Sequence, residues 1–128
     1  MSDLRPRGVP VIVCGVERHF LFTLAAIDEA QHKFDKKLNE ILADIADEFP
    51  AGHTLKDIMQ ILIQDEIDRE KNRNPDSNLQ MPTEQELEWE IAADTYIMLM
   101  KAVYEAYGIS LPEPEDNDPN RKSGQQSN

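Results

Sequence analysis

Residues 9–22 constrain the fold more than any other stretch, because their alternation of apolar side chains changes phase at one point. The change falls at Cys14 and Gly15, and glycine readily takes the positive φ that a tight two-residue turn requires. A turn there pairs Val13 with Val16 and brings the apolar residues of both strands onto one face of a β-hairpin. The predicted face consists of Val9, Val11, Val13, Val16, Phe20 and Phe22.

The other face of this predicted hairpin is mixed in character. It carries Ile12, Cys14, Glu17, His19 and Leu21. Pro10 has no N–H to donate to a ladder, so we expect the first strand to lie at a sheet edge. A lone hairpin is only marginally stable in water, so helices must cover its apolar face.

Apolar residues spaced three or four apart predict a long first helix after the hairpin. We expect it to begin at an N-cap, Thr23, and to run to about Phe49, where Pro50 and Gly52 end it. Its apolar stripe consists of Leu24, Ile27, Ala30, Phe34, Leu38, Ile41, Ile45 and Phe49. A second helix, capped by Thr54, is apolar over more than one face and is predicted to be central.

A third helix is expected after a loop at residues 72–82, which are rich in asparagine and proline. Thr83 and Glu86 have the spacing of a capping box at its start. The helix is predicted to reach about Tyr107, because Gly108 is a natural residue to follow a helix end.

These elements predict an α+β fold that is mainly α, with an N-terminal β-hairpin packed on about three helices. Residues 9–111 are expected to form a single domain, since the 128-residue chain fits one core. Residues 1–8 are interpreted as a disordered arm. Residues 112–128 are acidic and rich in proline, which predicts a disordered C-terminal tail.

The balance of charge limits the classes of partner. The chain has 25 acidic and 13 basic residues and a formal charge of −12. Such a charge repels nucleic-acid phosphates and anionic membrane surfaces, so we expect neither as a partner. The single cysteine, Cys14, cannot form an intrachain disulfide, and no apolar run reaches the roughly 20 residues that span a bilayer. We therefore expect a cytoplasmic protein.

Few residues are arranged for catalysis. Glu29 and His32 have the Glu-x-x-His spacing of di-iron bundles, but no second pair accompanies them, and both lie outside the apolar stripe. The acidic run at residues 65–70 lacks the glycine of a calcium loop and is interpreted as a solvated helix end. Cys14 has no converging cations to activate its thiol. We expect a protein that is not an enzyme and has no cofactor or metal; a small metal enzyme built on Glu29 and His32 is the least favoured alternative.

The third predicted helix carries more apolar surface than one small core can bury, since residues 96–100 are all apolar. Aromatic side chains at helical spacing usually belong to a core, but they are also enriched at protein-binding hot spots. The candidate partner-binding residues are Trp89, Tyr96, Met100, Tyr104 and Tyr107.

The order of these features resembles the tail assembly chaperones of long-tailed bacteriophages. The resemblance is carried by residues 11–15 (VIVCG) and 19–27 (HFLFTLAAI), and it covers residues 9–110. In that family the residue before the turn glycine is usually polar, and Cys14 departs from this pattern. The shared pattern consists of apolar residues and one glycine.

This resemblance implies a non-enzymatic protein of the host cytoplasm. Such chaperones coat the hydrophobic tape measure protein, keep it soluble and help recruit tail tube subunits; no catalytic residues are carried over. A longer frameshifted form and self-association into a homo-oligomer stay open. The alternative is an acidic regulator or DNA mimic that binds a basic partner protein, although the acids are spread over both residues 24–71 and residues 84–108.

Overall fold

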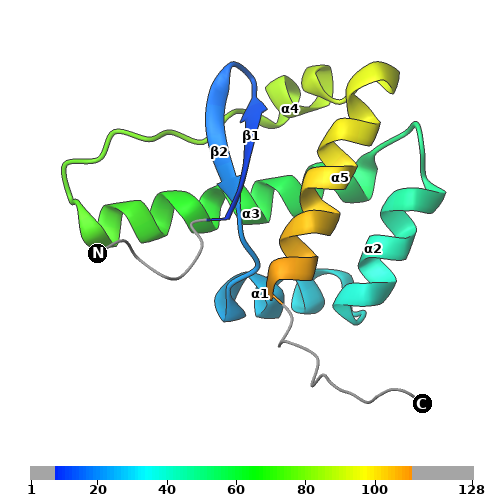
Figure 1. Cartoon of the computed structure of the whole chain (residues 1–128), viewed down its shortest axis with the longest axis horizontal. Helices are drawn as coiled ribbons and strands as arrows, with labels where there is room; N and C mark the ends of the chain where they lie inside the picture. Colours follow the sequence, from blue (N-terminus) through cyan, green and yellow to red (C-terminus); the bar gives the residue numbers. More distant parts are fainter. Residues whose placement is uncertain (1–7, 111–128) are drawn as a thin grey trace, which may run out of the picture.

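The computed structural model describes residues 8–110, with side chains as far as Gly108. The tail expected at residues 112–128 lies outside this range, as does the arm expected at residues 1–8 apart from Gly8. Within the described range, two strands are followed by five helices (Figure 1). The predicted class, a mainly α fold with an N-terminal hairpin, is confirmed, and two of the three predicted helices are each divided.

The hairpin consists of β1 (Val9–Val13) and β2 (Val16–Phe20), which pair antiparallel in the predicted register. Cys14 and Gly15 form its turn with φ angles of 53° and 79°, the positive values that a type I′ turn requires at both central positions. One member of the predicted apolar face departs from it. Val16 is 41% exposed, although its partner Val13, which also flanks the turn, is fully buried.

The first predicted helix is in fact two helices, α1 (Leu24–Phe34) and α2 (Leu38–Asp47). The chain leaves the helical conformation at Asp35, which has a φ of 54°. An unbroken helix over residues 23–49 would be about 40 Å long, more than a domain of this size can cover. The break lets both α1 and α2 contact the same third helix. Phe49, the last member of the predicted stripe, lies beyond the end of α2 and is 45% exposed.

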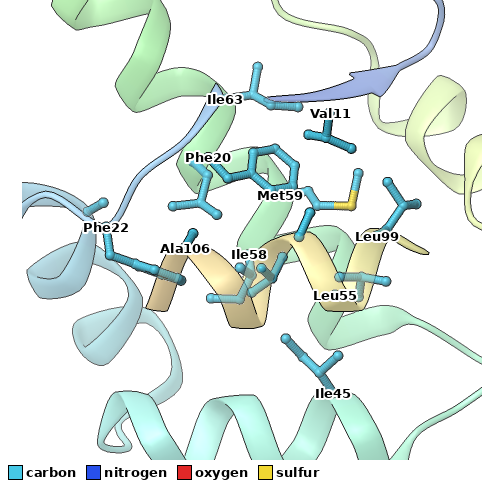
Figure 2. Close-up of a cluster of buried hydrophobic side chains, with 14 of the residues drawn as sticks. Val11, Phe20, Phe22, Ile45, Leu55, Ile58, Met59, Ile63, Leu99 and Ala106 are labelled. Atoms are coloured by element: carbon cyan, nitrogen blue, oxygen red, sulfur yellow. The ribbon is translucent and has the colours of Figure 1, made fainter. Parts of the chain in front are cut away.

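The central helix is α3 (His53–Arg73), which crosses the molecule and contacts α1, α2 and β2 (Figure 1). Its fully buried side chains form the middle of the core: Leu55, Ile58, Met59, Leu62 and Ile63. All of these except Leu62 are labelled in Figure 2. The predicted cap is wrong, because the helix begins at His53 and Gly52 is its N-cap. The Thr54 hydroxyl instead donates a hydrogen bond of 2.7 Å to Glu48, which ties α3 to the end of α2.

The third predicted helix is divided into α4 (Glu84–Glu90) and α5 (Ala93–Ser110). Leu87 and Tyr96 are both fully buried. Nine residues make two and a half helical turns, so in one continuous helix these two side chains would point in opposite directions. The break at residues 91–92 lets both enter the same core.

The two ends of the α4–α5 segment differ in how well the sequence predicts them. Thr83 and Glu86 form the predicted capping box: the Thr83 hydroxyl accepts from the Glu86 N–H at 3.0 Å, and the Glu86 carboxylate accepts from the Thr83 N–H at 2.8 Å. The predicted C-terminal end is wrong, because α5 continues through Gly108 to Ser110. A glycine costs a helix only about 1 kcal/mol relative to alanine, which a helix packed on a core can tolerate.

An ion-pair cluster joins α4 to α3. Lys56, a nearly buried residue of α3, donates hydrogen bonds to Glu84 at 2.7 Å and to Glu88 at 3.2 Å. The hydrogen bond with Glu84 raises the pKa of Lys56 and lowers that of Glu84. Because Leu87 packs into the core between these two glutamates, α4 is held by both apolar and charged contacts.

Candidate partner-binding site

The structure separates the five residues that the sequence suggests as partner-binding. Trp89, on α4, is 71% exposed, and Tyr104, on α5, is 39% exposed. Tyr96 is fully buried, and Met100 and Tyr107 are partly buried against the core. The five side chains therefore do not share one exposed surface.

Two of these tyrosines hold α5 against α2. The Tyr96 hydroxyl donates to the carbonyl oxygen of Ile45 at 2.5 Å, and the Tyr104 hydroxyl donates to that of Leu42 at 2.6 Å. The Tyr96 ring also meets the Phe49 ring edge-on, with centroids 5.1 Å apart. Burial is the largest cause of a raised pKa at both phenols, so both remain proton donors at neutral pH. These contacts give the two tyrosines a structural role.

An apolar groove lies between α5 and β1, and it is open to solvent. Its volume is about 780 Å³. Ile12 of β1 and Ile97 and Met98 of α5 line it, and their side chains are 53%, 40% and 48% exposed. The buried residues Val11 and Ala102 also line the groove. Large exposed apolar side chains that gather in one place are typical of interaction sites, whereas scattered ones are not.

Charged side chains also line the groove, and we call them its rim. Glu17 of β2 and Asp94 and Glu105 of α5 supply carboxylates, and Lys101 is the single base among the described lining residues. On α5 the lining residues lie at positions 94, 97, 98, 101, 102 and 105. Each has another lining residue three or four positions away, so together they form one face of the helix. The groove therefore combines an apolar centre with an acidic rim.

The sequence contained a partial signal for this groove. Ile97 and Met98 belong to the apolar run at residues 96–100, which covers more of the helix than one core can bury. Ile12 stands on the mixed face of the hairpin. The sequence could not predict that these residues meet, because β1 and α5 lie at opposite ends of the described chain.

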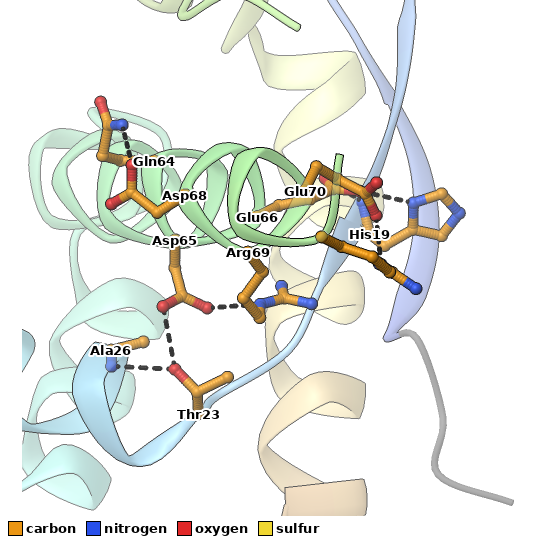
Figure 3. A network of polar contacts seen from close by, with 10 residues as sticks. His19, Thr23, Ala26, Gln64, Asp65, Glu66, Asp68, Arg69 and Glu70 are labelled. Carbon is orange, nitrogen blue, oxygen red and sulfur yellow. Dashed lines mark hydrogen bonds and ion pairs between the residues drawn. The ribbon is translucent and has the colours of Figure 1, made fainter. Parts of the chain in front are cut away.

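A group of polar contacts lies on the other side of the hairpin, between β2 and α3 (Figure 3). Glu66 is 6% exposed and accepts from the backbone N–H of His19 at 2.9 Å and from its Nδ1 at 2.7 Å. Asp65 accepts from the Thr23 hydroxyl at 3.0 Å and from Arg69 Nε at 2.9 Å. The interpretation of this acidic run as a solvated helix end is therefore wrong for Asp65 and Glu66, and it describes only the exposed Asp68 well.

The structure places the residues that the sequence raises as candidates for a metal site or a reactive thiol. Among them, no group of three or more histidines, cysteines and carboxylates is arranged to hold a metal ion. Glu29 and His32 are both exposed on α1. Burial, followed by the charges of Glu90 and Glu86, raises the pKa of the Cys14 thiol, which disfavours the reactive thiolate.

No described helix is both long enough and apolar enough to cross a bilayer. Comparison with protein-family models, curated proteins and solved structures finds no match. Function is therefore inferred from the geometry of the groove and from the resemblance in the sequence.

Proposed function

We propose that this protein shelters an apolar segment of another polypeptide, as a tail assembly chaperone of a long-tailed bacteriophage. Its main client would be the tape measure protein, and it would help to recruit tail tube subunits in the host cytoplasm. The observation that carries this proposal is the open groove between β1 and α5, whose centre is formed by Ile12, Ile97 and Met98.

The form of the groove favours a polypeptide client over a small molecule. Small-molecule sites surround most of their ligand, whereas this groove is open along one face of α5. The exposed aliphatic side chains supply the contact that an apolar segment needs. The formal charge of −12 then keeps a complex with an aggregation-prone client in solution.

The sequence resemblance supplies the specific assignment. A glycine-turn hairpin, a second strand leading into Phe22 and Thr23, and a series of amphipathic helices occur in the same order in the tail assembly chaperones. The structure contains this order of elements within residues 9–110. The assignment to phage tails rests on that resemblance, while the binding role rests on the groove.

Co-expression tests the proposal directly. The tape measure protein encoded in the same genome is produced alone, with this protein, or with an unrelated acidic protein of similar size. We expect the soluble fraction of the tape measure protein to rise several-fold only with this protein, and the two to elute together in gel filtration. No gain in solubility over the unrelated acidic protein would overturn the chaperone assignment.

An acidic regulator or DNA mimic is a second candidate, favoured by the three exposed glutamates of α4, Glu84, Glu86 and Glu88. Two of the three already pair with Lys56, and other exposed acids lie on β2 and on each remaining helix. Mimicry of a phosphate backbone needs a continuous acidic face instead. Capture of a basic host protein that is released at moderate salt would favour this candidate.

A further inference from the structure

The outward-facing backbone groups of β1 can be assigned from the geometry of the turn. In a hairpin with a two-residue turn, the residues that flank the turn exchange both hydrogen bonds across the ladder. Val13 and Val16 are that pair, so Val11 and Val9 also face β2. The backbone groups of Ile12 and Pro10 therefore point away from the partner strand. This edge offers two carbonyl oxygens and one N–H, that of Ile12.

The opposite edge, on β2, is already occupied. By the same alternation the N–H of His19 points outward, and it donates to the buried carboxylate of Glu66 at 2.9 Å. The helix α3 also contacts this strand. In contrast, no hydrogen bond from any described residue reaches the outward backbone groups of Ile12. The hairpin is therefore closed on one edge and open on the other.

The open edge lies beside the apolar groove, which adds side-chain contacts to the free backbone groups. Ile12 contributes to both features, because its side chain lines the groove and its N–H faces outward. An extended segment that pairs with an edge strand directs alternate side chains to opposite sides. One set of these side chains would pack against Ile97 and Met98 of α5, the other wall of the groove.

The charges around the groove indicate which segment binds there. Glu17, Asp94 and Glu105 outnumber Lys101 on the rim. A second copy of this chain would bring the same acidic rim and a further −12 of charge. Residues 111–128 of this chain also contain more acids than bases. Both are therefore poorer occupants than a segment with basic ends.

We propose that β1 binds an extended segment of a partner protein as a third strand, with alternating apolar residues and flanking lysine or arginine. This inference rests on the proposed function, because it names how the client is held and which part of it is recognised. The backbone of Ile12 supplies the pairing, Ile97 and Met98 supply the apolar contact, and the acidic rim selects the basic ends.

A designed peptide tests the mode of binding with the full-length protein. The probe is a short capped peptide in which valine alternates with threonine and a lysine closes each end. We expect saturable binding by fluorescence anisotropy, with amide shifts in NMR spectra centred on Ile12 and Met98. Two matched peptides should bind at least tenfold more weakly: one with N-methylated amides along one edge, and one with glutamate in place of lysine. Equal binding of the N-methylated peptide would overturn strand addition.

Protein variants locate the site. Ile12→Pro removes the outward N–H without disturbing the ladder, since that N–H does not face β2, and Ile12→Thr keeps it. Met98→Glu places a charge in the groove, and Leu24→Glu is the matched control at a residue of α1 that is 77% exposed. We expect at least tenfold weaker peptide binding for Ile12→Pro and Met98→Glu, and unchanged binding for Leu24→Glu. A dimer in sedimentation that Met98→Glu dissociates would assign the groove to a second copy and overturn the proposal.

The same variants separate this inference from the proposed function. If Met98→Glu and Ile12→Pro still solubilise the tape measure protein as well as the natural chain does, the chaperone assignment stands and the strand-addition mode is wrong. If the natural chain binds the peptide but does not solubilise the tape measure protein, the strand-addition mode is supported and the phage assignment fails. Circular dichroism spectra confirm that each variant is folded before binding is compared.

Discussion

The two edges of the hairpin show how the same small sheet is fixed on one side and left available on the other. On the β2 edge, the N–H of His19 meets the buried carboxylate of Glu66, and α3 covers the strand. On the β1 edge, the N–H of Ile12 faces an open groove bordered by exposed Ile97 and Met98. An uncovered edge strand risks unwanted pairing. Here Pro10 shortens the exposed edge, and acidic residues surround it.

This difference separates stability from binding within one hairpin. Polar contacts on the β2 side join residues far apart in sequence and hold the hairpin on the central helix. Another such contact is made by Arg18, which is 4% exposed and donates to the carbonyl oxygen of Gln80 at 2.8 Å. The β1 side has exposed apolar groups that add little to stability. We therefore expect substitutions of the polar contacts on the β2 side to lower the free energy of unfolding, and substitutions of the exposed apolar side chains on the β1 side to change mainly binding.

The largest expected loss of stability among these substitutions is at the β2 edge of the hairpin. Glu66→Ala removes two hydrogen bonds to a charged acceptor and should lower the free energy of unfolding by about 3 kcal/mol in urea denaturation. Asp68→Ala, at an exposed acid of the same helix, is the control and should change it by less than about 0.5 kcal/mol. Equal effects of the two substitutions would contradict the special role of the β2 edge.

A smaller loss of stability is expected for a substitution of Tyr96, a buried residue of α5, the helix that lines the groove opposite β1. Tyr96→Phe leaves the Ile45 carbonyl oxygen without its donor and should lower the free energy of unfolding by about 1.5 kcal/mol. Tyr104→Phe should cost less, because that side chain is 39% exposed and water can replace the hydroxyl. The order of the two effects is checked by urea denaturation, and the reverse order would contradict it.

The same tyrosines predict a loss of stability at high pH. Burial raises the pKa of both phenols in the folded chain. The unfolded chain therefore loses these protons first, and the free energy of unfolding should fall as the pH rises above about 10. The raised pKa of Lys56 adds to this decline independently of the tyrosines. Urea denaturation at several alkaline pH values should show a shallower decline for the Tyr96→Phe variant, and an equal decline would contradict the prediction.

The smallest effect on stability is expected on the open side. Met98→Glu should change the free energy of unfolding by less than about 0.5 kcal/mol, since the side chain is 48% exposed. Leu99→Ala, at the fully buried neighbour, should lower it by about 3 kcal/mol and calibrates the measurement. A loss of stability for Met98→Glu that approaches that of Leu99→Ala would show that the open side is part of the core.

Elements that depend on neighbouring residues could be predicted from the sequence. The phase change at Cys14 and Gly15 located the turn and its register, and the spacing of Thr83 and Glu86 located a helix start. The points where a helix breaks and the chain changes direction could not be predicted. A regular apolar spacing through Asp35 looked continuous, although the chain turns there so that both halves pack on α3.

The sequence by itself determined the hairpin, the mainly helical class and the acidic exterior, because turn geometry, side-chain periodicity and charge are local properties. Only the tertiary structure decided which apolar residues of α5 are covered. The α2 helix takes the side that carries Tyr96 and Tyr104, and β1 leaves Ile97 and Met98 partly open. Only the tertiary structure likewise decided that Glu66 is buried and that Asp68, two residues further along α3, is exposed. Burial depends on which distant strand a side chain meets.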